Sequence, residues 1–335
     1  RAFGPRANSA EIEGSKSFAK DLMKKYGIPT ARYEVFTEAE PARAYIRREG
    51  APIVVKADGL AAGKGVIVAM SEQEALDAVN AIMEGNSFGD AGARVVIEEF
   101  MEGEEASLLA FTDGKTIRPM ISAQDHKRAF DGDQGPNTGG MGTYAPAPVM
   151  TPEMIDRATE EILKPTLAAM AKEGRPYSGC LYLGLMITVE GPKVVEFNAR
   201  FGDPETQVVL PLLDGDLVQI MCACADGTLA DVPIHWKDGA AVCVVLAAGG
   251  YPAAYEKGNE IHGIADAEKT GALVFHAGTA AKEGKLVTNG GRVLGVVGMG
   301  EDIASAVHSA YAAVEKISFK DAYYRKDIAH RALHR

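Results

Sequence analysis

The chain has 335 residues, of which 24% are charged and 47% hydrophobic, and its formal net charge is −11 at pH 7. This length suggests two or three packed units around an ample core. The acidic balance argues against nucleic acid or an anionic membrane as a partner, so local basic groups must meet any anionic substrate.

The cysteines and histidines indicate neither a disulfide framework nor a zinc site. None of the cysteines belongs to a CxxC pair, all lie in apolar segments, and the seven histidines show no ligand spacing. The cysteines are Cys180, Cys222, Cys224 and Cys243. We find no signal peptide and no long uncharged apolar run, so we expect a reduced, cytoplasmic protein with core cysteines and no membrane span.

Helices dominate the predicted structure of the first fifty residues. They are expected at 8–14, 15–26 and 37–50, with a short strand at 32–36. Asn8 with Glu11, and Thr37 with Glu40, read as capping boxes. Ser15 opens the second helix and places a lysine, Lys16, in its first turn.

Next comes a strand, a glycine-rich turn and a returning strand, at 52–57, 58–65 and 66–70. Lys56 lies in the first strand and Lys64 in the turn. Backbone N–H groups left open by glycine, together with lysine charges, form a phosphate cradle. The segment is neither a Walker motif nor a dinucleotide fingerprint, and taken alone a plain hairpin loop would look the same.

Acidic residues lie in the next two predicted strands and in the turn that joins them. A helix is predicted at 71–83 and strands at 95–100 and 105–112, which completes a small α+β unit. Glu98 lies in the first of these strands. The backbone at Phe100 and Met101 can read an adenine edge, and Glu105 can accept from ribose hydroxyls. Taken alone, acidic decoration of a turn is the favoured interpretation.

The second half begins with a polar stretch rich in Gly and Pro, at 124–148, and a loop of this length is usually functional or disordered. The elements expected after it are a helix at 151–171, a hairpin at 177–188 and 193–198, a buried helix at 207–225, a β-rich unit after Pro233, and a helix at 301–317.

The strand at 194–198 carries a polar face. Alternate residues share a face, so Glu196, Asn198 and Arg200 project together. A carboxylate and an amide oxygen suit Mg²⁺, and an arginine fork clamps phosphate oxygens. Taken alone, this strand is equally well explained as a solvated polar edge.

Together these features occur in the order found in ATP-grasp carboxylate–amine ligases, which the chain resembles. The segments at 14–18, 55–66, 124–128, 135–142 and 196–207 narrow the resemblance to the phosphoribosylamine–glycine ligase family. The resemblance implies an α+β ATP-grasp fold with a small C-terminal β-rich domain. It places the start of the central domain at 1–33, a lid at 34–101, the rest of the central domain at 102–232 and the β-rich domain at 233–335.

The resemblance also implies roles for individual residues. ATP would be bound by Lys16, Lys56, Gly63, Lys64, Gly65, Glu98, Phe100, Met101 and Glu105. Arg200, Lys56 and Lys64 would be catalytic, and Glu196 and Asn198 would hold Mg²⁺ or Mn²⁺. Asp203 would bind the ammonium of glycine. Phosphoribosylamine would be bound by Asp125, Lys127, Asn137, Thr138, Gly139, Gly140 and, at its 5′-phosphate, Arg292, with Arg200 also near the substrates.

The implied reaction joins glycine to 5-phosphoribosylamine at the expense of ATP, through glycyl phosphate, as the second step of de novo purine synthesis. One departure is that Gly184 stands near the position where other ATP-grasp ligases carry a second metal-binding carboxylate. Another is that the family's N-terminal Rossmann-like domain would precede Arg1, as a possible covalent partner. The alternatives are another ATP-grasp ligase, or a nucleotide-binding fragment that is inactive without that domain.

Overall fold

The computed structural model describes residues 1–59, 65–85 and 92–335, and divides them into two compact units. Unit 1 comprises Arg1–Pro119, Thr151–Arg200 and Val218–Val232. Unit 2 comprises Met120–Met150, Phe201–Leu217 and Pro233–Arg335. Among the predicted site residues, Gly63 and Lys64 lie outside the described ranges. The mixture of helices and antiparallel sheets confirms the predicted α+β class.

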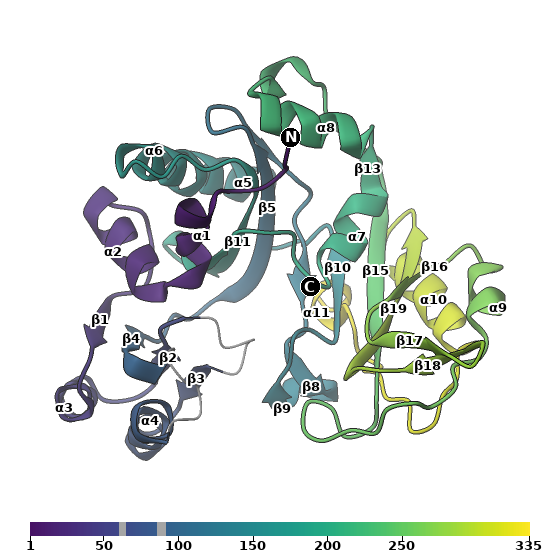
Figure 1. The fold of residues 1–335 in the computed structure, drawn as a ribbon, viewed down its shortest axis with the longest axis horizontal. Coiled ribbons are helices and arrows are strands. Elements are labelled where there is room, and N and C mark those ends of the chain that lie inside the picture. The colour runs from purple at the N-terminus through teal and green to yellow at the C-terminus, as the bar shows by residue number, and fades with distance from the viewer. Residues whose placement is uncertain (60–64, 86–91) are drawn as a thin grey trace. The chain divides into compact units, whose positions relative to one another are not determined.

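The first sheet of unit 1 has four antiparallel strands in the order β1-β4-β2-β3 (Figure 1). Its elements are β1 (Tyr33–Phe36), α3 (Ala39–Glu49), β2 (Ile53–Ala57), β3 (Val66–Ala69), α4 (Glu72–Val79) and β4 (Val95–Glu99), with a π-helical turn at Asn80–Glu84. Val55 and Ile97 pack with Ile46 of α3 and Val79 of α4 in one buried cluster. Because neighbours alternate along a strand, Lys56 projects from the face of β2 opposite to this cluster.

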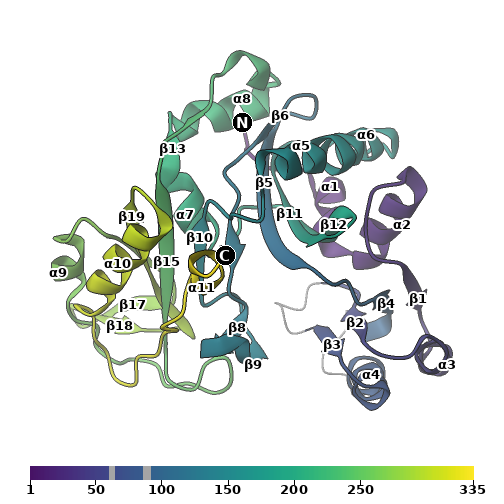
Figure 2. The ribbon, with the colours of Figure 1, turned by 180° about the vertical axis from the view of Figure 1, so that it is seen from behind.

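The second sheet of unit 1 has the order β12-β11-β5-β6, and helices contact it mainly at β12 (Figure 2). Its strands are β5 (Glu104–Thr112), β6 (Ile117–Pro119), β11 (Gly179–Thr188) and β12 (Gly191–Asn198). The helices are α1 (Ala7–Gly14), α2 (Lys16–Tyr26), α5 (Pro152–Ala158), α6 (Lys164–Lys172) and α8 (Leu217–Asp226), with shorter turns at Thr159–Leu163 and Leu229–Asp231. The predicted hairpin at 177–198 is confirmed.

The N-termini of α1, α2 and α3 differ in how they are capped. Ser15 accepts a hydrogen bond from the Phe18 N–H and caps α2, as expected. The predicted capping boxes at Asn8 and Thr37 are wrong, since the extended residues before α1 and α3 are Arg6 and Glu38, and neither helix has a side-chain cap. Asn8 already has helical geometry, so its side chain cannot serve the first N–H groups of α1.

Unit 2 is built on a five-stranded sheet in the order β16-β19-β15-β10-β7. Its strands are β7 (Gln124–Asp125), β10 (Gly142–Ala145), β15 (Ala240–Ala247), β16 (Leu273–His276) and β19 (Arg292–Gly300). The other elements are the two-stranded pairs β8–β9 (Arg128–Phe130, Gln134–Asn137), β13–β14 (Leu213–Asp214, His235–Trp236) and β17–β18 (Thr279–Lys282, Lys285–Thr288), a 3₁₀ turn at Asp131–Asp133, and helices α7 (Thr206–Val209), α9 (Ile264–Glu268), α10 (Ile303–Val314) and α11 (His330–Leu333).

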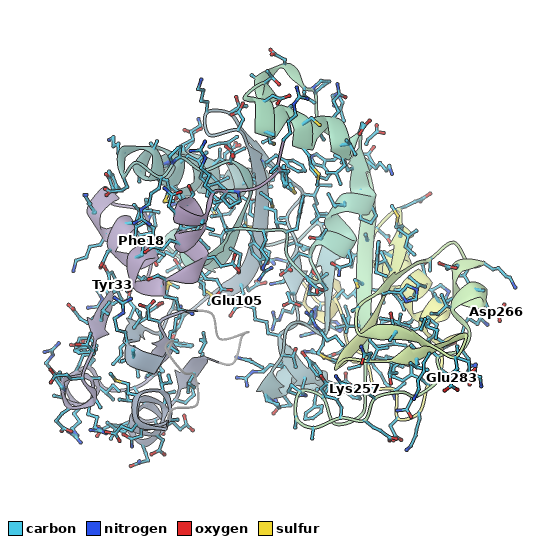
Figure 3. All side chains as sticks on the ribbon, viewed as in Figure 1. Phe18, Tyr33, Glu105, Lys257, Asp266 and Glu283 are labelled. Carbon is cyan, nitrogen blue, oxygen red and sulfur yellow. The ribbon has the colours of Figure 1, made fainter. Side chains whose placement is uncertain are left out.

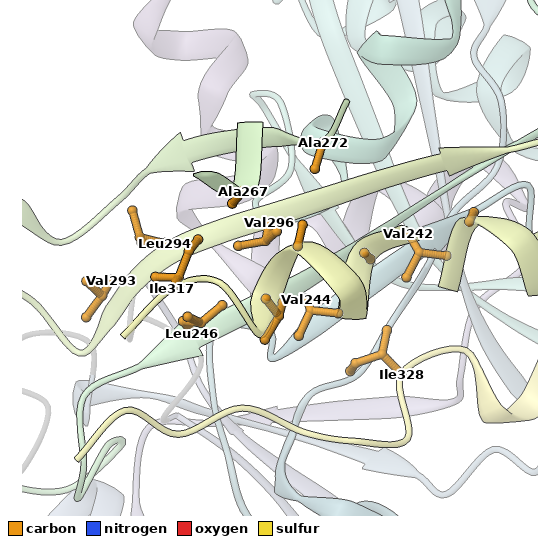
Figure 4. Packing of buried hydrophobic residues seen from close by; sticks show 14 of the residues in the cluster. Val242, Val244, Leu246, Ala267, Ala272, Val293, Leu294, Val296, Ile317 and Ile328 are labelled. Carbon is orange, nitrogen blue, oxygen red and sulfur yellow. The ribbon is translucent and has the colours of Figure 1, made fainter. Parts of the chain in front are cut away.

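The core of unit 2 lies between this sheet and α10 (Figure 4). Val242, Val244 and Leu246 point from β15 into a cluster that includes Ala310. The helix approaches so closely that a Cβ on Gly298 would lie 2.2 Å from the Ala310 nitrogen. Glycine in β19 is therefore required for this packing.

The predicted buried helix at 207–225 is wrong. The chain instead forms α7, a 3₁₀ turn at Leu210–Leu212, the short strand β13 and then α8. Pro211 has no N–H group for a continuing helix, and β13 finds backbone partners in β14. This break divides the segment, with α7 and β13 in unit 2 and nearly all of α8 in unit 1.

The compact units group 120–150 with the C-terminal residues, because β10 pairs with β15. The division into a lid, a central domain and a C-terminal domain therefore remains a proposal.

Three of the four cysteines are buried, as predicted for core cysteines, whereas Cys222 is partly exposed. Burial raises the pKa of the Cys224 thiol to about 12, so this thiol stays protonated at neutral pH. Among the helices that the described ranges contain, none has the length and apolar character needed to span a bilayer.

Candidate active site

Two lysines predicted to meet phosphates lie in one neighbourhood of unit 1. Lys56 is 4% exposed, and its Nζ lies 2.9 Å from Glu98 Oε1 and donates to the Val195 carbonyl at 3.1 Å. Lys16 is the first residue of α2 and donates to the Gly59 carbonyl at 2.7 Å. Burial lowers the pKa of Lys16, and among its charged neighbours the Glu196 carboxylate opposes this shift most. The structure thus brings Lys16, Lys56 and Glu196 together.

Each carboxylate oxygen of Glu98 lies within ion-pair distance of a buried lysine. Its side chain is 2% exposed, and its Oε2 lies 2.9 Å from the Nζ of Lys20, a residue that sequence analysis missed. Burial alone would raise the pKa of Glu98, but Lys56 and Lys20 hold it below its usual value. Burial lowers the pKa of Lys20 to about 8. The Glu98 carboxylate is therefore paired with two buried lysines.

Asp58 ties the end of β2 to the start of α2. Its carboxylate accepts from the Ser17 N–H at 3.0 Å and from the Ser17 hydroxyl at 2.6 Å, and pairs with Arg94 at 3.0 Å. These contacts place Lys16 beside the strand that carries Lys56. Sequence analysis gave Asp58 no role, although a carboxylate directly after a strand and before a glycine is a visible signal. The carbonyl of Gly65, a residue also predicted at the site, directly precedes β3 and accepts from the Ala57 N–H at 2.8 Å.

The predicted metal-binding pair lies at the end of β12. Glu196 is partly exposed, and Asn198 is 8% exposed. Arg200 follows them, donating from Nη2 to Asn198 Oδ1 at 3.2 Å, and its Nε lies 3.2 Å from a Glu13 oxygen. Glu13, which sequence analysis missed, also accepts from the Ala199 N–H at 2.7 Å. The end of β12 is therefore anchored to α1.

Gly184 lies directly opposite Glu196 in the pairing of β11 with β12. A Cβ at Gly184 would lie 3.1 Å from Glu196 Cγ. The absence of a side chain at Gly184 therefore leaves room for the Glu196 side chain.

We predict that Gly184→Ala weakens metal binding, because the added methyl group displaces the Glu196 side chain. The expected result is a roughly tenfold higher half-saturating Mg²⁺ concentration, the lower end of the range for disturbed ligand orientation. Gly215→Ala is the control, since a Cβ at Gly215 meets nothing within 4 Å. An unchanged Mg²⁺ requirement in Gly184→Ala would contradict this assignment.

The predicted adenine-reading segment joins β4 to β5. Phe100 and Met101 are partly exposed, and Glu105 is exposed near the start of β5 (Figure 3). A Cβ on Gly103 would lie 2.4 Å from the Ile187 carbonyl oxygen, so the connection from β4 to β5 packs closely against β11. The exposed Glu105 carboxylate follows this connection.

The residues predicted to bind the other substrates, apart from Arg200, gather in unit 2. Thr138 donates from its N–H to the Lys127 carbonyl at 2.7 Å, and Asn137 pairs with Arg128 in the β8–β9 ribbon. The Gly139 N–H donates to the Tyr251 hydroxyl at 3.1 Å, and the Gly140 N–H to Thr138 Oγ1 at 3.0 Å. These two N–H groups therefore already have partners, one in Tyr251 and the other within the loop.

Asp203 and Arg292, predicted to bind different substrates, contact each other. Arg292 Nη2 lies 3.1 Å from Asp203 Oδ2, and its Nη1 donates to the Gly139 carbonyl at 2.9 Å. Arg292 thus holds two loops together, and its guanidinium charge is shared with a carboxylate.

The Asp125 carboxyl group of this cluster has a strongly raised pKa. Burial, and then the nearby Glu205 carboxylate, raise its pKa well above the usual range, while Lys127 opposes the shift. A Cβ on Gly140 would lie 2.8 Å from Asp125 Oδ1 and 2.5 Å from Pro204 Cδ, and the φ of Gly140 is +116°. Only glycine fits here, so the loop lies directly against the Asp125 carboxyl group.

A four-stranded antiparallel sheet that carries a buried lysine, and a second sheet in the same unit with a Glu-x-Asn strand, have the arrangement of an ATP-grasp fold. The solved biotin carboxylase domain of the Hydrogenobacter thermophilus 2-oxoglutarate carboxylase has this fold, with a TM-score of 0.71 at 17% identity over 96% of this chain and 69% of that chain.

Comparison with models of protein families identifies the family of this chain. The model of the phosphoribosylglycinamide synthetase ATP-grasp (A) domain matches residues 14–206, and that of the C domain matches residues 241–331. The chain belongs to the phosphoribosylglycinamide synthetase family.

Two similar relatives are phosphoribosylamine–glycine ligases. Those of Vibrio parahaemolyticus and Rhizobium meliloti are 54% and 55% identical over 99% of this chain, which spans 78% of each relative. The solved ligase of Thermotoga maritima is 43% identical with a TM-score of 0.90, over 98% of this chain and 81% of that chain.

Proposed function

We propose that this chain joins glycine to 5-phosphoribosylamine with ATP, giving glycinamide ribonucleotide, ADP and phosphate. The observation that carries the proposal is the convergence of Lys16, Lys56 and Glu196 in unit 1, within the family-matched range. It joins cationic groups for phosphates to a carboxylate for a divalent metal ion.

In the first step a carboxylate oxygen of glycine attacks the γ-phosphorus of ATP. The bond to the ADP oxygen breaks, and glycyl phosphate forms. Lys16 and Lys56 neutralise phosphate charge, and Arg200 holds the transferring phosphoryl group. The residues supply positioning and charge, so no side-chain nucleophile is required.

In the second step the amine nitrogen of phosphoribosylamine attacks the acyl carbon of glycyl phosphate. The C–O bond to phosphate breaks, phosphate leaves, and the amine loses a proton. Asp125, Lys127, Arg292 and the loop at 137–140 are the residues we assign to this substrate. The raised pKa of Asp125 makes its carboxyl group a candidate for hydrogen bonding with the amine.

Mg²⁺ or Mn²⁺ fits the oxygen donors at the end of β12. Glu196 and Asn198 offer a carboxylate and an amide oxygen two positions apart, and Gly184 opposite Glu196 leaves room for phosphate oxygens and water. When bound there, the ion would neutralise charge on the phosphates.

The test is ADP release by the purified chain with ATP and Mg²⁺, with each other substrate omitted in turn. We expect sustained ADP release only with glycine and phosphoribosylamine together, and glycinamide ribonucleotide by mass spectrometry. ATP binding without turnover would favour a nucleotide-binding role. Turnover with another carboxylate in place of glycine would favour a different ATP-grasp ligase.

We predict that Asp203→Asn raises the KM for glycine about 10-fold to 100-fold and leaves the KM for ATP within twofold. A lost charge-assisted bond to the glycine ammonium costs about 1.5–3 kcal/mol, and every ~1.4 kcal/mol is tenfold. Arg292→Met is the comparison, because it removes the partner of Asp203 and keeps the carboxylate. Equal effects of Asp203→Asn on both substrates would indicate that this residue acts only in holding the loops.

A further inference from the structure

Lys20 is a buried lysine that the proposed reaction does not use directly. It lies one turn after Lys16 on α2 and is 2% exposed. Its Nζ donates to Thr30 Oγ1 at 2.7 Å and lies 2.9 Å from Glu98 Oε2. The ring of Tyr33, whose place is marked in Figure 3, lies with its centre 5.8 Å from the same Nζ.

The contacts of Lys20 continue to the phosphate-binding lysine. Glu98 Oε1 lies 2.9 Å from Lys56 Nζ, and Lys56 donates to the Val195 carbonyl on β12 at 3.1 Å. A buried series of polar contacts therefore runs from Thr30 through Lys20, Glu98 and Lys56 to β12. Two lysines share one carboxylate, so this group of three side chains carries a net positive charge when both lysines are protonated.

Burying three charged groups is costly unless each is paired, so this arrangement calls for a reason beyond stability. Lys20 is enclosed and cannot itself reach a nucleotide without a rearrangement. Its effect must pass through Glu98, whose second oxygen it occupies. If Lys20 is absent, both oxygens of Glu98 are left to Lys56, and the Lys56 ammonium is held more strongly by protein.

We propose that Lys20 is a positioning residue that, through Glu98, keeps the Lys56 ammonium available to nucleotide phosphates. The inference rests on the proposed function, in which Lys56 contacts the phosphates of ATP. It predicts an effect that depends on the number of phosphates, because Lys56 would meet the β- and γ-phosphates rather than the nucleoside. A purely structural role for Lys20 would weaken all nucleotides alike.

The experiment compares binding of ATP and AMP to the whole chain by titration calorimetry, with Mg²⁺ present. Lys20→Met should raise the Kd for ATP about 10-fold to 100-fold, the size typical of removing a group that orients a ligand. The Kd for AMP should stay within about twofold. Lys24→Met is the matched control, because Lys24 is exposed, lies on the same helix and also contacts the Tyr33 ring, at 5.5 Å.

Wild-type ATP affinity in Lys20→Met would overturn the proposal, as would equal losses for ATP and AMP. Lys56→Ala in the same assay tests the underlying function separately. If Lys56→Ala weakens ATP binding while Lys20→Met does not, only the proposed role of Lys20 is wrong. If Lys56→Ala binds ATP normally, the assignment of Lys56 fails, and the role of Lys20 with it.

The double variant Lys20→Met/Glu98→Gln covers the case in which Lys20→Met does not fold, because it removes the carboxylate that lost its partner. With this carboxylate neutral, it no longer holds the Lys56 ammonium in place of Lys20, so the double variant should bind ATP and AMP with affinities close to those of wild type. A selective loss of ATP affinity in the double variant would overturn the proposal, because the effect of Lys20 would then not pass through the hold of Glu98 on Lys56.

Discussion

Replacing Lys56 with alanine should reduce kcat/KM for ATP by about two to four orders of magnitude. The Lys56 ammonium is held at the end of β2, on the sheet face opposite to the core of α3 and α4. Two charge-assisted bonds to phosphates, each worth about 1.5–3 kcal/mol, are lost with it. At ~1.4 kcal/mol per tenfold, this loss gives the predicted range. Steady-state kinetics with varied ATP measure it.

The same substitution should also destabilise the fold, which the sequence did not reveal. Lys56 is one of two partners of the buried Glu98 carboxylate, and breaking a buried ion pair from one side costs about 3–5 kcal/mol. Because Lys20 still pairs with Glu98, we expect the lower end of that range in denaturant unfolding. Assays of Lys56→Ala therefore need a folded-fraction control at each temperature.

Lys193→Ala is the comparison for Lys56→Ala. Lys193 lies in the β11–β12 hairpin and pairs at 2.6 Å with Glu190, which is 71% exposed, so its loss should change stability by about 1 kcal/mol or less. If Lys56→Ala kept wild-type turnover and wild-type ATP affinity, Lys56 would be a purely structural lysine.

The local features of the site could be predicted from the sequence because they depend on neighbouring residues. The alternation of apolar residues in 52–57 predicts β2 and places Lys56 on the face opposite Val55. The same alternation in 194–198 places Glu196 and Asn198 side by side on β12. Ser15 before an amphipathic segment predicts the start of α2, and so the position of Lys16.

The partners of these residues could not be predicted, because they come from distant parts of the chain. Asp58 bonds to Ser17 across 41 positions, and Arg292 to Asp203 across 89. No local pattern distinguishes Lys20 from the exposed Lys24 one turn later. Only the arrangement of β4 beside β2 shows that Lys20 and Lys56 share Glu98.

The break in the expected helix at 207–225 has a related cause. The composition of this segment favours one buried helix, and Pro211 alone is compatible with a helix start. The pairing of β13 with β14, more than twenty positions later, decides the outcome. Tertiary pairing of this kind lies outside what local propensity can predict.

Replacing Glu196 with glutamine should raise the half-saturating Mg²⁺ concentration about 100-fold and lower kcat about 10²-fold to 10³-fold. Glutamine keeps the size of the side chain and an amide oxygen, so the change removes one charge. The residue opposite Glu196 on β11 is Gly184, so that position offers no second carboxylate to compensate. Loss of a preorganised charged group next to transferring phosphate costs rate as well as metal affinity.

Binding of Mn²⁺ in the presence of ADP, followed by electron paramagnetic resonance, measures the Glu196→Gln effect independently of turnover. Glu190→Gln is the matched control, since Glu190 lies in the turn of the same hairpin and is exposed, with Lys193 as its partner. We expect Glu190→Gln to bind Mn²⁺ as wild type does, and Glu196→Gln to bind it about 100-fold more weakly, in step with the higher Mg²⁺ requirement. If Glu196→Gln bound Mn²⁺ normally and kept its rate at limiting Mg²⁺, the polar face of β12 would be structural, and the metal ion would be held elsewhere.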